Sequence, residues 1–277
     1  MDIKAFKMDG LGNDFLIIDR RKKSISIKKE KIIELGKRDN IGFDQLIFID
    51  EIDNGNPSYN PITIYNSDGE EVEACGNGSR CVAKILCDQE KKEGAVIVTS
   101  NRILKAQKIS ENSIRLAMGE PIFEWKKIPL LKEMNNKNLK IKINSLNGKE
   151  IIGGFALSVG NPHVVFFVDD FNNFNLNEIG PKIENHNYFP ERCNVTLATI
   201  KNKKHLKIKV WERGAGLTKA CGTAACASVV SGSVLNHNDR CVDVEFKEGI
   251  LNIDWKTDNN IYMTGKVSEI KKITINI

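Results

Sequence analysis

Two cysteines in matching sequence contexts are the strongest candidates for chemistry in this chain of 277 residues. Cys75 lies in an Ala-Cys-Gly triplet, and the same triplet surrounds Cys221, 146 residues later (221 − 75). Each triplet stands where a glycine-containing polar loop gives way to a segment with helical patterning. A helix dipole stabilises the thiolate of a cysteine at the helix N-terminus and lowers its pKa. We therefore expect both thiols to be reactive.

A glycine follows each of the two cysteines directly, at Gly76 and Gly222. Its missing side chain leaves the outward-pointing N–H groups of a helix start open to an anion such as a carboxylate. If two such halves face each other about a pseudo-two-fold axis, both thiols approach one small ligand from opposite sides. This suits removal of a proton from one face of an α-carbon and its return on the other, with one thiolate and one thiol. The alternative is that both cysteines pack in the core beneath their helices.

The sequence upstream of each cysteine repeats the same features in the same order, which indicates a duplicated domain. A polar residue closes an alternating strand nine residues before each cysteine: Asn66 before Cys75 (75 − 66) and Glu212 before Cys221 (221 − 212). The other matched features are Gly12-Asn13 and Gly160-Asn161, helical segments near 28–38 and 175–184, and strand openings at Gln45 and Asn194. The alternative is that two α/β halves share a strand and helix rhythm by chance.

Alternating strands and amphipathic helices together predict an α+β, or mixed α/β, fold with two pseudo-symmetric domains. The clearest strands are 62–65 and 206–211, and the clearest further helices are 76–87 and 222–235. We place the N-terminal domain, with Cys75, at residues 1–119 plus 267–277, because the last strand is expected to return to it. The C-terminal domain, with Cys221, is placed at 120–266. The charged stretch 125–138 is expected to be a connection or an early insertion.

Composition narrows the classes of function. The chain is 41% hydrophobic and 28% charged, and its net charge of +5 is spread along the sequence, so we expect an ordinary globular protein without a nucleic-acid partner. No segment approaches the ~18 apolar residues of a membrane span, and we expect a cytoplasmic protein without a membrane partner. The 7 cysteines form no C-x-x-C pair, which favours thiols over disulfides or structural zinc. We expect no metal and no cofactor.

Several stretches around these residues closely resemble the diaminopimelate epimerase family. They are KMDGLGNDF at 7–15, NSDG at 66–69 with ACGNGSR at 74–80, GNPH at 160–163, and WERGAG at 211–216 with ACGT at 220–223. The resemblance implies a cofactor-independent isomerase that interconverts LL- and meso-diaminopimelate in lysine and peptidoglycan biosynthesis, usually as a homodimer. It also implies two domains that close over the substrate, each a curved, mostly antiparallel sheet around a central helix.

The resemblance further implies a role for each matching residue. The thiols of Cys75 and Cys221 act as acid and base, and the residues that assist their protonation are His163 and Glu212. The reacting amino group is held by Asn13 and Gln45, and the reacting carboxylate by the helix starts Gly76-Asn77 and Gly222-Thr223. Binding of the distal carboxylate falls to Asn66, Asn161, Asn194 and Arg213, and binding of the distal ammonium to Glu212. Without the resemblance, these would be ordinary turn or strand residues, a surface ion pair and a core histidine.

Two other functions compete with this one. A proline-racemase-like or hydroxyproline epimerase also pairs two cysteines across a duplicated fold, but its substrate has one carboxylate and a ring nitrogen. The distal set described above would then have no ligand to hold. A redox-switch binding protein is the second alternative, in which Cys75 and Cys221 form a reversible disulfide. It would bind ligand without exchanging a substrate proton with solvent.

Overall fold

The computed structural model describes residues 1–52, 56, 58–73, 75–145 and 148–277. Ala74, part of the first Ala-Cys-Gly motif, lies outside the described residues. The chain divides into two compact units, Met1–Ala117 with Thr264–Ile277, and Met118–Met263. Within the part of the chain that is described, no helix is long and apolar enough to cross a membrane.

The first unit begins with a hairpin and a parallel crossover. β1 (Asp2–Gly10) pairs antiparallel with β2 (Asn13–Asp19) across a turn in which Leu11 and Gly12 have φ of 58° and 75°. β3 runs parallel to β2 after the crossover helix, and β4 and β5 follow antiparallel. The bounds of these elements are α1 (Lys29–Gly36), β3 (Gln45–Ile49), β4 (Tyr59–Asn66) and β5 (Glu71–Val72).

A central helix and a second set of strands complete the first unit. α2 (Gly76–Glu90) leads into β6 (Gly94–Val98), which returns parallel to β4. β7 (Ile103–Ser110) pairs antiparallel with β6 and with β8 (Ser113–Gly119). The last strand, β19 (Lys271–Asn276), pairs antiparallel with β1.

The second unit has the same succession of elements. A β9–β10 hairpin precedes β11, which pairs antiparallel with β12, and β13 runs parallel to β12 after η1 and α3. β14 and β15 follow antiparallel, and after α4 strand β16 returns parallel to β14 and pairs with β17. The bounds are β9 (Ile141–Asn144), β10 (Glu150–Gly153), β11 (Phe155–Ser158), β12 (Pro162–Phe167), η1 (Phe171–Asn173), α3 (Leu176–Glu184), β13 (Asn194–Asn202), β14 (His205–Glu212), β15 (Gly216–Thr218), α4 (Gly222–Val234), β16 (Cys241–Phe246), β17 (Gly249–Trp255) and β18 (Ile261–Lys266).

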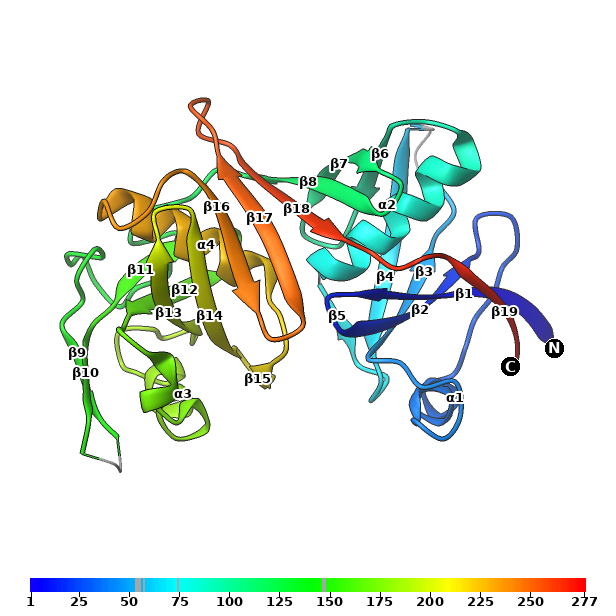
Figure 1. The fold of residues 1–277 in the computed structure, drawn as a ribbon. Coiled ribbons are helices and arrows are strands. Elements are labelled where there is room, and N and C mark those ends of the chain that lie inside the picture. The colour runs from blue at the N-terminus through cyan, green and yellow to red at the C-terminus, as the bar shows by residue number, and fades with distance from the viewer. Residues whose placement is uncertain (53–55, 57, 74, 146–147) are drawn as a thin grey trace. The chain divides into compact units, whose positions relative to one another are not determined.

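The two successions match strand by strand, which confirms the duplication predicted from spacing. In Figure 1, β2, α1, β3, β4 and α2 run from blue to cyan, and β12, α3, β13, β14 and α4 run from green to orange. In both series a helix connects two parallel strands, an antiparallel strand follows, and a buried helix begins after a short strand. The predicted mixed α/β fold with two pseudo-symmetric halves is thus confirmed.

One helix forms the centre of each unit. α2 contacts β1, β2, β3, β6 and β7, and α4 contacts β11 to β14, β16 and β17. The core of α4 is built from small residues, and its buried hydroxyls are satisfied within the helix because Ser228 and Ser231 donate to the carbonyls of Ala224 and Ala227, both at 2.8 Å. Such a helix is apolar on every side and packs against strands all round.

The stretch 125–138 is not a simple connection. It lies inside the second unit, and the side chains of Ile128 and Leu130 are buried in one core cluster with Ile179 of α3. Only Pro129 separates Ile128 from Leu130, and charged residues lie on both sides of this short group, so it is too short to show a helix or strand period. The segment therefore forms part of the second core.

Candidate functional site

Cys75 occupies the position that caps the start of α2. Its backbone is extended, with φ −144° and ψ 110°, and the N–H of Gly78 donates to its sulfur at 3.4 Å. The side chain is partly exposed. A sulfur that receives a backbone N–H at a helix start is well placed to carry negative charge.

The first turn of α2 is held against the strands behind it by contacts that leave no room for larger residues. A Cβ atom on Gly78 would lie 2.5 Å from Cδ1 of Ile47 and 3.3 Å from the ring of Phe15. Arg80, which has no exposed surface, donates through Nη2 to Oδ1 of the buried Asn77 at 2.8 Å. The amide of Asn77 is therefore fixed by a charged group beneath it.

The other predicted residues of the first unit lie at the ends of strands β2, β3 and β4. Gln45 opens β3 directly opposite Asn66, which closes β4, and the Gln45 amide donates to Asn66 Oδ1 at 3.0 Å. Asn13 pairs with Gly10 at the tip of the β1–β2 hairpin, and a Cβ on Gly10 would lie 3.3 Å from the carbonyl oxygen of Asn77. Among the described residues, Oε1 of Gln45 is a buried acceptor without a hydrogen-bond donor. It is available to an ammonium ligand.

Cys221 occupies the same position before α4 with a similar backbone, φ −137° and ψ 115°, but its side chain makes no capping hydrogen bond and its surroundings differ. It is only 6% exposed, and its sulfur lies 3.4 Å from Oγ1 of Thr223. Burial raises the pKa of the Cys221 thiol well above 9.0, the charge of Glu212 and a hydrogen bond to it act in the same direction, and the Thr223 hydroxyl opposes them. The glycine after it is also enclosed, because a Cβ on Gly222 would lie 2.6 Å from the sulfur of Met263.

This result corrects the expectation that both cysteines have a lowered pKa. A helix start stabilises an anion by about 0.3–1 kcal/mol at an exposed site, whereas complete burial can raise a thiol pKa by several units. At Cys221 burial and the neighbouring carboxylate dominate. Cys221 is therefore a neutral thiol near neutral pH.

The remaining predicted residues of the second unit contact one another along β12, β13 and the end of β14. Nε2 of the fully buried His163 lies 3.0 Å from Oδ1 of Asn161, and His163 stands opposite Asn194 in the parallel ladder. The Asn194 amide donates to the carbonyl of Pro162 at 2.9 Å, and its Oδ1 accepts the backbone N–H of Arg213 at 3.0 Å. The Asn194 side chain thus connects β12 with the end of β14.

The pairing of strands also shows which residues correspond between the units. Gln45 stands opposite Phe15, just as Asn194 stands opposite His163, so Asn13 corresponds to Asn161 and Phe15 to His163. Asn66 and Glu212 correspond as the last residues of β4 and β14. The second unit therefore has ionisable residues at two positions where the first has Asn66 and Phe15. The two units therefore share their backbone arrangement but differ in the charge of their side chains at these positions.

The predicted residues divide between the units: Asn13, Gln45, Asn66, Cys75, Gly76 and Asn77 belong to the first, and Asn161, His163, Asn194, Glu212, Arg213, Cys221, Gly222 and Thr223 to the second. Sequence reasoning missed the buried carboxylate of Glu184, which accepts from Trp211 and Gly214 on either side of Glu212 and Arg213. One signal was available: a glutamate that ends a helix opposes the helix dipole and so needs other partners.

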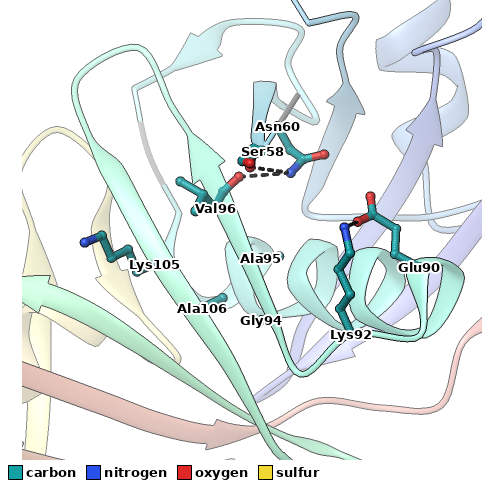
Figure 2. A pocket seen from close by; sticks show the side chains of 9 residues that line it. All are labelled: Ser58, Asn60, Glu90, Lys92, Gly94, Ala95, Val96, Lys105 and Ala106. Atoms are coloured by element: carbon teal, nitrogen blue, oxygen red, sulfur yellow. Dashed lines mark hydrogen bonds and ion pairs between the residues drawn. The ribbon is translucent and has the colours of Figure 1, made fainter. Parts of the chain in front are cut away.

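A cavity of about 290 Å³ lies elsewhere in the first unit. Figure 2 shows its lining, in which Asn60 donates to the carbonyls of Ser58 and Val96, and Lys92 pairs with Glu90. None of the predicted site residues lines it, and several of its polar groups already bond one another. We do not assign the chemistry to this cavity. Over the described ranges, no group of three or more His, Cys, Asp or Glu residues is placed to hold a metal ion.

Comparison with solved structures defines the class of fold. The chain matches a predicted epimerase from Pseudomonas aeruginosa with a TM-score of 0.68 at 13% identity, covering 99% of both chains. It matches a hydroxyproline epimerase from Agrobacterium vitis with a TM-score of 0.65 at 11% identity, covering 100% of this chain and 93% of the other. The chain thus has the same fold as these two proteins.

Sequence comparison identifies the family within this class. The model of the diaminopimelate epimerase family matches residues 5–124 and 155–270. A diaminopimelate epimerase of Pelagibacter ubique is 49% identical over 280 aligned positions, covering 100% of both chains. The chain belongs to the diaminopimelate epimerase family, as the motifs around Cys75 and Cys221 predicted, and it is an isomerase.

Proposed function

We propose that this chain interconverts LL- and meso-2,6-diaminopimelate with two thiols and without a cofactor, in lysine and peptidoglycan biosynthesis. The observation that carries the proposal is the pair of cysteines that directly precede equivalent helices of a duplicated fold in different electrostatic surroundings. An epimerase needs a base on one face of the α-carbon and an acid on the other, and reversal of the reaction exchanges their roles. Each unit supplies one of these groups.

The surroundings of the two thiols support an order of proton transfer. Cys75, whose sulfur receives the Gly78 N–H, is the thiolate that removes the α-proton, and the C–H electron pair remains on the substrate. Cys221, whose burial keeps it protonated, delivers its S–H proton to the opposite face of the same carbon. One C–H bond breaks and one forms. The two cysteines end with exchanged protonation states. The reverse reaction restores them directly, and before another forward turnover Cys75 releases its proton to solvent and Cys221 takes one up from it.

The helix starts and the nearby amides bind the reacting end of the substrate in this proposal. Backbone N–H groups at Gly76-Asn77 and Gly222-Thr223 hold the α-carboxylate, where negative charge develops as the proton leaves. The buried Oε1 of Gln45 accepts from the α-ammonium together with Asn13. A Cβ at position 222 would meet the sulfur of Met263 at 2.6 Å, so a larger residue there requires the Met263 side chain to move.

The distal end of the substrate is bound through the asymmetry between the units. Arg213, with Asn66, Asn161 and Asn194, binds the distal carboxylate, and Glu212 binds the distal ammonium. Glu212 also hydrogen bonds to the Cys221 thiol. The same carboxylate therefore contacts both the distal ammonium of the substrate and the thiol that acts as acid. His163, held by Asn161, assists the same proton transfer.

We also propose that the two units act as the two epimerase domains, that the chain works as a homodimer, and that it resides in the cytoplasm. The strand-by-strand correspondence supports the first of these. The homodimer rests on the family resemblance, and the cytoplasmic location suits a mechanism that needs reduced thiols in a reducing compartment.

The test is to incubate the reduced protein with LL-diaminopimelate, without added cofactor, and to follow meso-diaminopimelate by chiral chromatography. We expect epimerisation by the wild-type chain, and its loss in Cys75→Ser and in Cys221→Ser. General acid and base groups contribute on the order of 100- to 10,000-fold each, so the loss should be of that size. Full activity in either variant would remove that cysteine from the mechanism.

A further inference from the structure

Glu184 is a buried carboxylate that contacts the segment carrying Glu212 and Arg213. It is the last residue of α3 and is 5% exposed. Its Oε2 accepts the indole N–H of Trp211 at 2.7 Å, and its Oε1 accepts the backbone N–H of Gly214 at 2.9 Å. The guanidinium of Arg192 lies 3.5 Å from Oε1. Both carboxylate oxygens are therefore engaged.

Placing the Glu184 carboxylate here has a free-energy cost that its hydrogen bonds must offset. A carboxylate at the C-terminal end of a helix faces the negative end of the dipole, and burial adds the loss of its hydration. The two N–H donors and the Arg192 guanidinium compensate for these costs. All of these contacts lie within the second unit.

The two donors flank the residues of interest along the chain. Trp211 immediately precedes Glu212, and Gly214 immediately follows Arg213. A third contact comes from the backbone N–H of Arg213 to Oδ1 of Asn194. Gly214 has φ of 75°, a conformation that a hydrogen bond to its N–H helps to select. The backbone of the segment is thus fixed at both ends.

The Trp211 indole packs directly against α3, so the position of this helix determines where the adjacent Glu212–Arg213 segment lies. A Cβ atom on Gly180 of α3 would lie 2.6 Å from Cγ and Cδ2 of the indole, so the helix contacts the ring directly. The equivalent helix of the first unit, α1, ends in Gly36, so it offers no carboxylate at that point. The contact between Glu184 and Trp211 thus lies in the unit that has Glu212 at the position equivalent to Asn66.

We propose that Glu184 is a positioning residue that sets the Glu212–Arg213 segment, and through it the recognition of the distal carboxylate of the substrate. This inference rests on the proposed function. Glu184 does not contact the reacting atoms. It acts by holding the indole of Trp211 and the N–H of Gly214, so that Arg213 presents its guanidinium in one orientation.

The experiment compares Glu184→Gln with Glu178→Gln, a matched change on the same helix whose side chain contacts Ser145 and Lys182 instead. A glutamine retains one acceptor and turns a second donor toward an N–H group, so one of the two bonds is lost. We expect kcat/KM for diaminopimelate to fall on the order of 10- to 100-fold, mainly through KM, because the distal contact is made in ground and transition states alike. Glu178→Gln should stay within about twofold of wild type.

A double-mutant cycle separates positioning from general damage to the fold. If Glu184 acts through Arg213, Glu184→Gln should cost much less in an Arg213→Ala background than in the wild type. If the fold-losses in kcat/KM of the two single variants multiply to give the loss of the double variant, the inference is overturned. Gly180→Ala serves as a second variant if Glu184→Gln fails to fold, since it displaces the same indole and should also raise KM.

The outcomes also distinguish this inference from the proposed function. If wild-type protein does not epimerise diaminopimelate, the proposed function fails first. If wild type is active and Glu184→Gln matches it within about twofold in KM, with Gly180→Ala also unchanged, only the positioning role is overturned.

Discussion

Selective alkylation of the two catalytic thiols follows from their different surroundings. We expect limiting iodoacetamide at pH 7.5 to modify Cys75 well before Cys221 in the reduced protein without substrate. Since only the thiolate reacts, the rate at each site follows its ionised fraction and its exposure. Cys221 is 6% exposed, and its neighbour Glu212 opposes formation of a second negative charge.

The size of the difference can be estimated from the same observations. Burial and the charge of Glu212 raise the pKa of Cys221, so only a small fraction of it is thiolate at pH 7.5 and its alkylation is correspondingly slow. Cys75 is partly exposed and its sulfur receives the Gly78 N–H. We therefore expect at least about a tenfold preference for Cys75.

Peptide mass spectrometry over a time course measures both rates in one sample. The exposed Cys241 reports access of the reagent to an ordinary surface thiol, and Cys75→Ser confirms the identity of the fast site. Activity should disappear in step with modification of Cys75. If Cys221 is alkylated as fast as Cys75, or if activity survives complete modification of Cys75, the assignment of thiolate and thiol is refuted.

Three further outcomes are expected. Because the acid form of Cys221 is required and its pKa is raised, the alkaline limb of kcat/KM in the direction that uses it as acid should fall only as pH rises through that raised pKa, while the acid limb reports protonation of Cys75; a pH–rate profile whose alkaline limb already falls between pH 7 and 8 would contradict this. Gly222→Ala should lower the free energy of unfolding by about 1–3 kcal/mol in urea titrations, because its Cβ would meet the sulfur of Met263, and an unchanged midpoint would show that the side chain moves freely. Arg80→Lys should lower kcat/KM on the order of tenfold, because the buried hydrogen bond to Asn77 Oδ1 is lost, and an unaltered steady-state value would make Arg80 purely structural.

The strands and helices around the two cysteines were predictable because local sequence patterns determine them. The strand that ends at Asn66 and the strand that ends at Glu212 alternate with period two, and the helices after Cys75 and Cys221 begin at the predicted glycines. Equal spacing then revealed the duplication, since each half repeats the same order of elements. These features depend on residues close in the sequence.

The rest depends on contacts that the sequence does not display. Burial of Cys221 raises its pKa against the effect of the helix start, and the carboxylate of Glu212 acts across nine residues of chain. Glu184 meets Trp211 only after α3 has packed against β14. The core position of Ile128 follows no regular period. Desolvation and packing between distant segments decide these features, and neither leaves a local pattern.

The central claim is that two thiols transfer a proton at one α-carbon. The most direct measurement incubates LL-diaminopimelate with the reduced protein in D2O, without cofactor, and follows the α-proton by NMR. We expect the α-proton signal to disappear as meso-diaminopimelate forms, because the proton on the acid thiol has exchanged with solvent. Epimerisation that retains the original proton, or the absence of both exchange and epimerisation, would contradict the account.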